Sequence, residues 1–158
     1  MEQSDDGDDV STIAGLIARQ FASVSWSRSV PADWQAFAAD FFQGASLYPA
    51  ARPARRQTVE GFIERMKGLA ATKLRSFEET VVGADIQVFG NVAVALAACE
   101  ITENDAKVSF GVEALLLIKD DGRWQIVSQT WDMASEANPL PERLAGGGTR
   151  VEVAERRP

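Results

Sequence analysis

Apolar residues between Val10 and Val24 recur at steps of three and four residues, the spacing of one face of a helix. The positions on this stripe are Ile13, Leu16, Ile17, Gln20, Phe21 and Val24. Asp9 or Ser11 can cap the start of the helix. The segment Arg28–Pro31 ends it, because a residue before proline avoids the helical region. We therefore predict a first helix that starts at about Val10.

Two shorter helices follow at the same spacing, over about 32–42 and 58–69. The first has Trp34 and Phe37 on its apolar face and ends at Gly44, and Ala45–Tyr48 then forms a short strand. The second has Thr58 as its N-cap and buries Phe62 and Met66.

From about residue 74 the pattern changes to a period of two, which is typical of strands. The predicted strands cover 74–89 (broken near Gly83), 91–102, 107–119 and 123–133. Asp121-Gly122 between two apolar arms is a strong hairpin signal. Helices followed by a long antiparallel meander indicate an α+β fold, with three helices packed on the concave face of a curved sheet.

The composition excludes several classes of function but does not identify one. The chain has 158 residues, one cysteine, no histidine and a net charge of −7. Catalysis by Ser-His or Cys-His pairs and zinc sites with histidine ligands are excluded, and we expect no metal and no cofactor. The acidic balance argues against nucleic acid, and no apolar segment approaches bilayer length, so the cytoplasm is the expected location. We expect an acidic tail over 1–9, one domain over 10–135 and an extended tail over 136–158.

The order of elements and the closing D-G-R-W-x-I-V hairpin resemble the nuclear transport factor 2-like superfamily, in its SnoaL-like, ketosteroid-isomerase-like branch. The resemblance covers about 10–133 and implies a cone-shaped fold, a deep pocket between sheet and helices, and a homodimer through the outer sheet face. The isomerase's tyrosine, base and oxyanion aspartate fall near Gln20, Pro49 and Gly111, so all three roles are vacant. Where SnoaL-like relatives often carry a histidine, the last strand has Ser128 and Thr130.

If Trp131 faces the pocket, a period of two places Gln125, Val127, Gln129 and Met133 beside it. The neighbouring strand would then present Glu113 and Leu115, and the strand before it small residues that leave room, among them Ala97 and Cys99. Glu113 is the catalytic candidate, because an acid in an apolar strand is desolvated and suited to proton transfer. The alternative for Glu113 is an arginine pair or a place in a dimer interface. Asp40 is a weaker candidate, more typical of a surface acid.

The expected ligand-binding residues are Gln20, Trp34, Tyr48, Phe62, Met66, Ala97, Cys99, Leu115, Gln129 and Trp131. Arg52, Arg55 and Arg56 match a bound anion or, equally, a solvated loop. Two hypotheses remain. The first is a pocket protein for a small, largely apolar organic molecule, with isomerase-, cyclase- or hydrolase-type acid–base chemistry. The second is a non-catalytic dimeric module for ligand binding or protein interaction.

Overall fold

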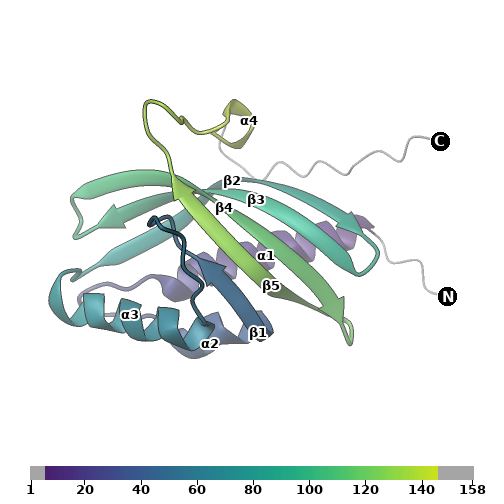
Figure 1. Ribbon diagram of the computed structural model, residues 1–158, viewed down its shortest axis with the longest axis horizontal. Helices are drawn as coiled ribbons and strands as arrows, with labels where there is room; N and C mark the ends of the chain where they lie inside the picture. The colour runs from purple at the N-terminus through teal and green to yellow at the C-terminus, as the bar shows by residue number, and fades with distance from the viewer. Residues whose placement is uncertain (1–5, 146–158) are drawn as a thin grey trace.

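The computed structural model describes residues 6–145, and Figure 1 shows the arrangement of its elements. The helices are α1 (Asp6–Val24), α2 (Trp34–Ala39), α3 (Val59–Thr72) and α4 (Glu142–Ala145). The strands are β1 (Phe41–Tyr48), β2 (Phe77–Phe89), β3 (Val92–Glu103), β4 (Lys107–Asp120) and β5 (Arg123–Met133). The predicted α+β class is confirmed.

The five strands form one sheet in the order β1-β5-β4-β3-β2. β2 to β5 are a continuous antiparallel meander, and β1 joins it parallel to β5. The turn between β4 and β5 contains Asp121 at φ 50° and Gly122 at φ 72°, the left-handed backbone that tight hairpins need. The hairpin predicted from Asp-Gly is therefore confirmed.

The core lies between α1 to α3 and the face of the sheet that curves around them. In Figure 1 α1 passes behind the strands and α2 and α3 lie along the lower side. Ile13 and Ile17 of α1 are fully buried, as the helical spacing predicted, and they join one apolar cluster with the inward side chains of the sheet, such as Leu117 and Ile126. Thr58 accepts a hydrogen bond from the amide of Gly61 at 3.0 Å, which confirms it as the N-cap of α3.

The first helix begins at Asp6, four residues before the predicted start. Asp9 is buried because its Oδ1 accepts hydrogen bonds from Lys119 Nζ at 3.0 Å and Trp124 Nε1 at 2.9 Å. These partners lie on β4 and β5, more than 100 residues away, so no local pattern indicates them. The rest of the predicted acidic tail, 1–5, lies outside the described residues.

The second helix ends at Ala39 instead of continuing to Phe42. Asp40 is buried and accepts a hydrogen bond from Arg19 at 2.7 Å, and the chain then enters β1 at Phe41. The prediction that Gly44 ends this helix is wrong. Gly44 lies within β1 at φ 78°, where the pairing with β5 is irregular. The parallel partner strand decides this boundary, because it supplies hydrogen bonds that a longer helix would forgo.

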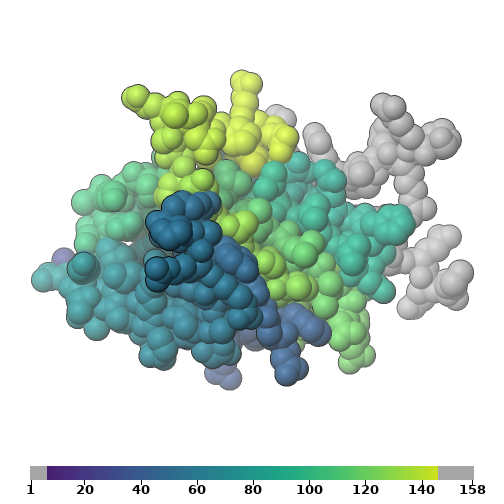
Figure 2. All heavy atoms as spheres, in the orientation of Figure 1, coloured from purple at the N-terminus to yellow at the C-terminus, as the bar shows by residue number. Residues whose placement is uncertain are grey.

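The segment after β5 differs from the extended tail predicted over 136–158, since it folds back as α4 onto the outer face of the sheet. Figure 2 shows this segment in yellow-green above the strands. Leu144 is buried there, and Gly83 leaves room for it: a Cβ on Gly83 would lie 2.5 Å from the carbonyl oxygen of Leu144. Residues 146–158 lie outside the described part. No helix within residues 6–145 is long and apolar enough to cross a membrane.

Candidate active site

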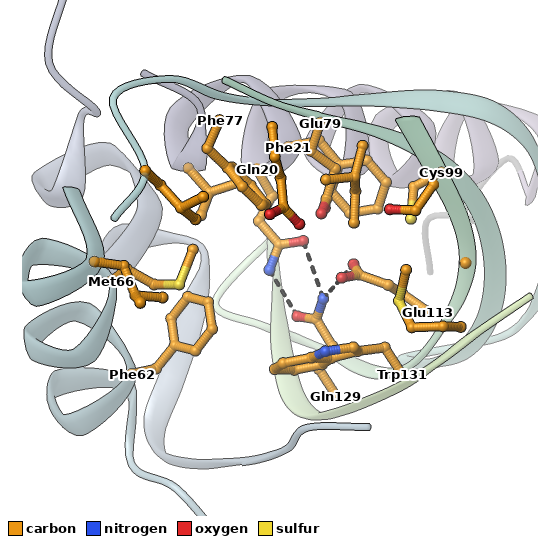
Figure 3. Close-up of a pocket in the computed structure, with 18 of the residues that line it drawn as sticks. Gln20, Phe21, Phe62, Met66, Phe77, Glu79, Cys99, Glu113, Gln129 and Trp131 are labelled. Carbon is orange, nitrogen blue, oxygen red and sulfur yellow. Dashed lines mark hydrogen bonds between the residues drawn. The ribbon is translucent and has the colours of Figure 1, made fainter. Parts of the chain in front are cut away.

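A cavity of about 580 Å³ lies between the concave face of the sheet and the helices α1 and α3. Its size falls in the range of small-molecule sites, about 300–1,000 Å³. Figure 3 shows Phe21 and Phe77 at the top of the view and Phe62 and Trp131 below, with the hydrogen-bonded Gln20, Gln129 and Glu113 between them. The predicted pocket between sheet and helices is thus present.

The apolar wall is built around Phe62 of α3. Its ring stacks on Phe37 with the centroids 5.4 Å apart and meets Trp131 edge-on at 5.7 Å. Phe21 and Phe77 lie on the opposite side of the cavity, near Gln20 (Figure 3). These rings offer flat surfaces against which a planar ligand can stack.

The polar wall is a chain of hydrogen bonds through Gln129. Gln20 Nε2 donates to Gln129 Oε1 at 2.6 Å, and Gln129 Nε2 donates to Gln20 Oε1 at 3.3 Å. Gln129 Nε2 also donates to Glu113 Oε2 at 2.6 Å. All three side chains are buried, at 1%, 4% and 7% exposure. A fixed amide pair therefore orients the carboxyl group of Glu113 toward the cavity.

A bulge in β5 decides which residues of this strand face the cavity. Leu116 pairs with Ser128 but Leu117 pairs with Ile126, so Val127 has no partner and the inward parity changes there. Ile126 faces inward before the bulge, and Gln129 and Trp131 face inward after it. The prediction that Gln125 and Val127 share the face of Trp131 is wrong, because a strict period of two does not cross a bulge.

Glu113 lies inside the cavity wall, as the sequence predicted, and has no arginine partner within the described residues. Burial raises the pKa of Glu113 to about 8, against smaller lowering effects of the hydrogen bonds from Gln129 and Glu79. The group is thus neutral near pH 7 and able to donate a proton. Within residues 6–145 no arginine provides the ion pair that the alternative for Glu113 requires.

Glu79 on β2 is an acid of the cavity lining that the sequence reasoning missed. Burial, with the nearby Glu113 charge as a second cause, raises the pKa of Glu79 well above its usual range. The signal was present, because Glu79 lies between Phe77 and Val81 in the same alternation that indicated Glu113. Only the pairing of β2 with β3 and of β3 with β4 shows that the two acids line the same cavity.

Cys99 lies next to these acids and is buried, as predicted. Burial, with the adjacent Glu79 and Glu113, raises the pKa of the Cys99 thiol far above its usual range. The thiol is therefore not a nucleophile at neutral pH, in agreement with the prediction of a small apolar side chain.

Most predicted ligand-binding residues line the cavity, and four do not. Those in the lining are Gln20, Phe62, Met66, Cys99, Gln129 and Trp131. Ala97 and Leu115 lie deeper in the core, because α1 packs over the sheet beyond the cavity. Trp34 packs on Trp26 at 6.3 Å and lines a separate surface hollow, and Tyr48 is outside the lining because Leu47 is the inward residue of β1.

The other polar candidates have structural partners elsewhere. Asp40 is held by Arg19 away from the cavity lining, and it is buried instead of lying on the surface. Arg52 donates to the carbonyl groups of Pro49, Ala50 and Ala51 in its own loop. Arg56 donates to Ser46 Oγ at 2.9 Å. Together with Arg55, these arginines are absent from the cavity lining, which leaves the solvated-loop reading.

The rim of the cavity carries charges of both signs from three parts of the chain. Arg65, Lys73, Lys107 and Asp132 are exposed, and Glu103 is half-buried. None of them forms an ion pair within 4.0 Å among residues 6–145. Solvated charges at the mouth and uncharged acids at the floor thus divide the site into two electrostatic zones.

A sequence-family model described as "Putative lumazine-binding" matches residues 29–132. This range includes α2, β1, α3 and all of the meander up to Asp132. No protein of curated function matches the sequence.

Several solved structures share the fold. An NTF2-like protein of unknown function from Pseudomonas putida KT2440 is 14% identical, with a TM-score of 0.66 over 90% of this chain and 94% of that one. A protein of unknown function with a cystatin-like fold from Nostoc punctiforme PCC 73102 is 17% identical, with a TM-score of 0.66 over 89% and 100%. A hexachlorocyclohexane dehydrochlorinase from Novosphingobium barchaimii LL02 is 11% identical, with a TM-score of 0.66 over 83% and 90%. The predicted nuclear transport factor 2-like fold is confirmed, and these identities carry no activity across.

Proposed function

Because this chain belongs to the family described as "Putative lumazine-binding", we propose that its cavity binds a small, planar, largely apolar organic molecule of the size of a bicyclic heteroaromatic ring. The carrying observation is the Gln20–Gln129–Glu113 hydrogen-bond chain, which ends at a cavity walled by aromatic rings. The rings bind the face of such a molecule and the polar chain binds its edge.

The polar chain suits a ligand edge that carries both a donor and an acceptor. The Gln129 amide uses its N–H groups toward Gln20 and Glu113, so it is held in one orientation. Glu113 then presents the carboxyl oxygen atoms that a ligand can reach. An N–H or C=O group of a lactam or imide ring is complementary to these groups, and a purely hydrocarbon ligand would leave them without a partner.

Binding is tested by titrating lumazine and following tryptophan fluorescence, since Trp131 lines the cavity. The Gln129→Leu variant removes the centre of the polar chain and should weaken binding at least tenfold. Gln35→Leu, at an exposed position of α2, is the matched control and should bind as the wild type does. Absence of binding at millimolar lumazine, or equal affinity of the Gln129→Leu variant, would refute the proposal.

Acid–base chemistry on the bound molecule is a second candidate, favoured by the position of Glu113. A buried carboxyl group with a pKa of about 8 exchanges protons near neutral pH, as isomerisation or cyclisation requires. If Glu113 is catalytic, Glu113→Gln abolishes turnover of any substrate while its binding stays within a few-fold of wild type. Binding without proton exchange at the ligand's carbon atoms in D₂O would leave the non-catalytic alternative.

The outer face of the sheet supports the proposal of a homodimer. Large apolar side chains are exposed there, among them Val94 at 49%, Phe110 at 39% and Leu116 at 48%. A second copy would cover this surface, and soluble monomers rarely leave such a patch open. Light scattering should give twice the monomer mass at micromolar concentration, and Leu116→Lys should shift the protein to monomer. A monomeric wild type would contradict this arrangement.

A further inference from the structure

Two carboxyl groups from different strands meet inside the cavity. Glu79 on β2 and Glu113 on β4 are each 7% exposed and both line the cavity, where Glu113 is near enough to Glu79 to be one cause of the raised pKa of Glu79. Figure 3 shows Glu79 on the upper wall and Glu113 beside Gln129. Among residues 6–145 neither carboxyl group has a lysine or arginine nitrogen within 4.0 Å. Two buried acids without a cation cannot both be ionised, so they share protons.

No other element packed on the pair brings a charge to it. α1 contributes the neutral Gln20, β3 the thiol of Cys99 and β5 the neutral Gln129. The other charged groups that line the same cavity are rim residues: the exposed Arg65, Lys73, Lys107 and Asp132 and the half-buried Glu103. The negative charge of the two carboxyl groups is therefore neutralised by bound protons instead of by a cationic side chain.

We propose that Glu79 is the positioning residue of this site: it donates its proton to a hydrogen bond with Glu113, and the O–H of Glu113 is left to bind a carbonyl oxygen of an uncharged, conjugated ligand. Two neutral carboxyl groups carry two O–H donors. One is used between the two acids, and the amide of Gln129 occupies Glu113 Oε2 as a donor. One O–H donor remains for the cavity.

This arrangement selects the charge of the ligand. A neutral carbonyl group accepts the free O–H, whereas a carboxylate at the cavity floor would lie beside two acids with no cation to balance it. The ligand class is thus an uncharged ring with a conjugated carbonyl group, such as a lactam, an enone or an aryl ester. This half of the inference rests on the proposed function, and the proton-sharing half does not.

The protonation of the pair is tested without any ligand, by infrared difference spectroscopy. At pH 7 the wild type should show the C=O band of neutral carboxyl groups, with a shift in D₂O. Glu79→Gln should remove about half of the band, and the double variant Glu79→Gln/Glu113→Gln should remove all of it. A wild-type spectrum without this band at pH 7 would overturn the inference. Presence of the band with no lumazine binding would refute only the proposed function.

The role of Glu79 is tested by the pH profile of binding, with methyl 2-naphthoate as the uncharged probe and 2-naphthoate as the anion of the same ring. At pH 7 the ester should bind at least tenfold more tightly than the anion, and its binding should be lost above about pH 8, where Glu113 ionises. Glu79→Met removes the hydrogen bond that lowers the pKa of Glu113, so the loss should move up by about one pH unit. Glu79→Gln keeps an N–H donor and should restore the wild-type midpoint.

Equal binding of ester and anion, or the same midpoint in the wild type and the Glu79→Met variant, would refute the positioning role. The wild-type comparison of the two probes needs no substitution, so it holds even if the Glu79→Met variant does not fold.

Discussion

The free energy of unfolding of this protein should fall as the pH rises from 5 to 7. In the Glu113→Gln variant this fall should be smaller, by about the contribution of one carboxyl group. The folded-state pKa of Glu113 is raised from 4.5 to about 8, so its stabilising contribution is complete below pH 4.5 and is lost as the pH rises toward 8. Between these values the unfolded chain has released the proton and the folded chain has kept it. Each such group lowers the free energy of unfolding by about 1.4 kcal/mol per pH unit, or about 3 kcal/mol over two units.

Glu79 adds a fall of the same sign, since its pKa is raised as well. The wild type should therefore lose at least the contribution of Glu113, about 3 kcal/mol, from pH 5 to pH 7. A glutamine at position 113 can still accept the hydrogen bond from Gln129 and does not titrate. The Glu113→Gln variant should accordingly lose about 3 kcal/mol less than the wild type over this interval.

The measurement is urea unfolding at pH 5, 6 and 7 for the wild type, the Glu113→Gln variant and Glu78→Gln, an exposed glutamate on the same strand as Glu79. The Glu78→Gln protein should follow the wild-type pH dependence. The reasoning fails if the wild type is equally stable at pH 5 and pH 7, or if the Glu113→Gln variant keeps the full slope, because either result would mean that Glu113 is ionised in the folded protein at pH 7.

Four further substitutions test the packing, each by chemical unfolding. Gly83→Ala should cost about 1–3 kcal/mol, because the new Cβ meets the carbonyl oxygen of Leu144 at 2.5 Å, whereas Gly68→Ala, with nothing within 4 Å on α3, should stabilise by about 0.5–1 kcal/mol. Asp9→Asn removes the charge that pairs with Lys119 and should cost about 1–3 kcal/mol. Thr58→Ala should cost about 1 kcal/mol through the lost N-cap. If Gly83→Ala left the free energy of unfolding unchanged, α4 would not pack on the sheet.

The tertiary structure decided the features that depend on distant partners. The bulge at Val127 reverses the inward parity of β5 and makes Gln129 and Trp131 pocket residues while excluding Gln125. Asp40 was interpreted as a surface acid, but Arg19 on α1 holds it in the interior. Such contacts join residues far apart in the chain, and a local pattern does not record which strand or helix lies opposite.

The sequence by itself determined the periodic features of this protein: three amphipathic helices, the Thr58 cap, the Asp121-Gly122 hairpin and the long strands of the meander, because hydrophobic spacing and turn chemistry are local. It also placed Glu113 on the pocket side of β4. The same period of two also indicates that Glu79 faces inward. It does not indicate that Glu79 lies near Glu113, because the two carboxyl groups come together only when β2, β3 and β4 are paired. The fold buries Glu79 and Glu113 in one cavity, with no lysine or arginine nitrogen of residues 6–145 within 4.0 Å of either carboxyl group, and this burial raises the pKa of both.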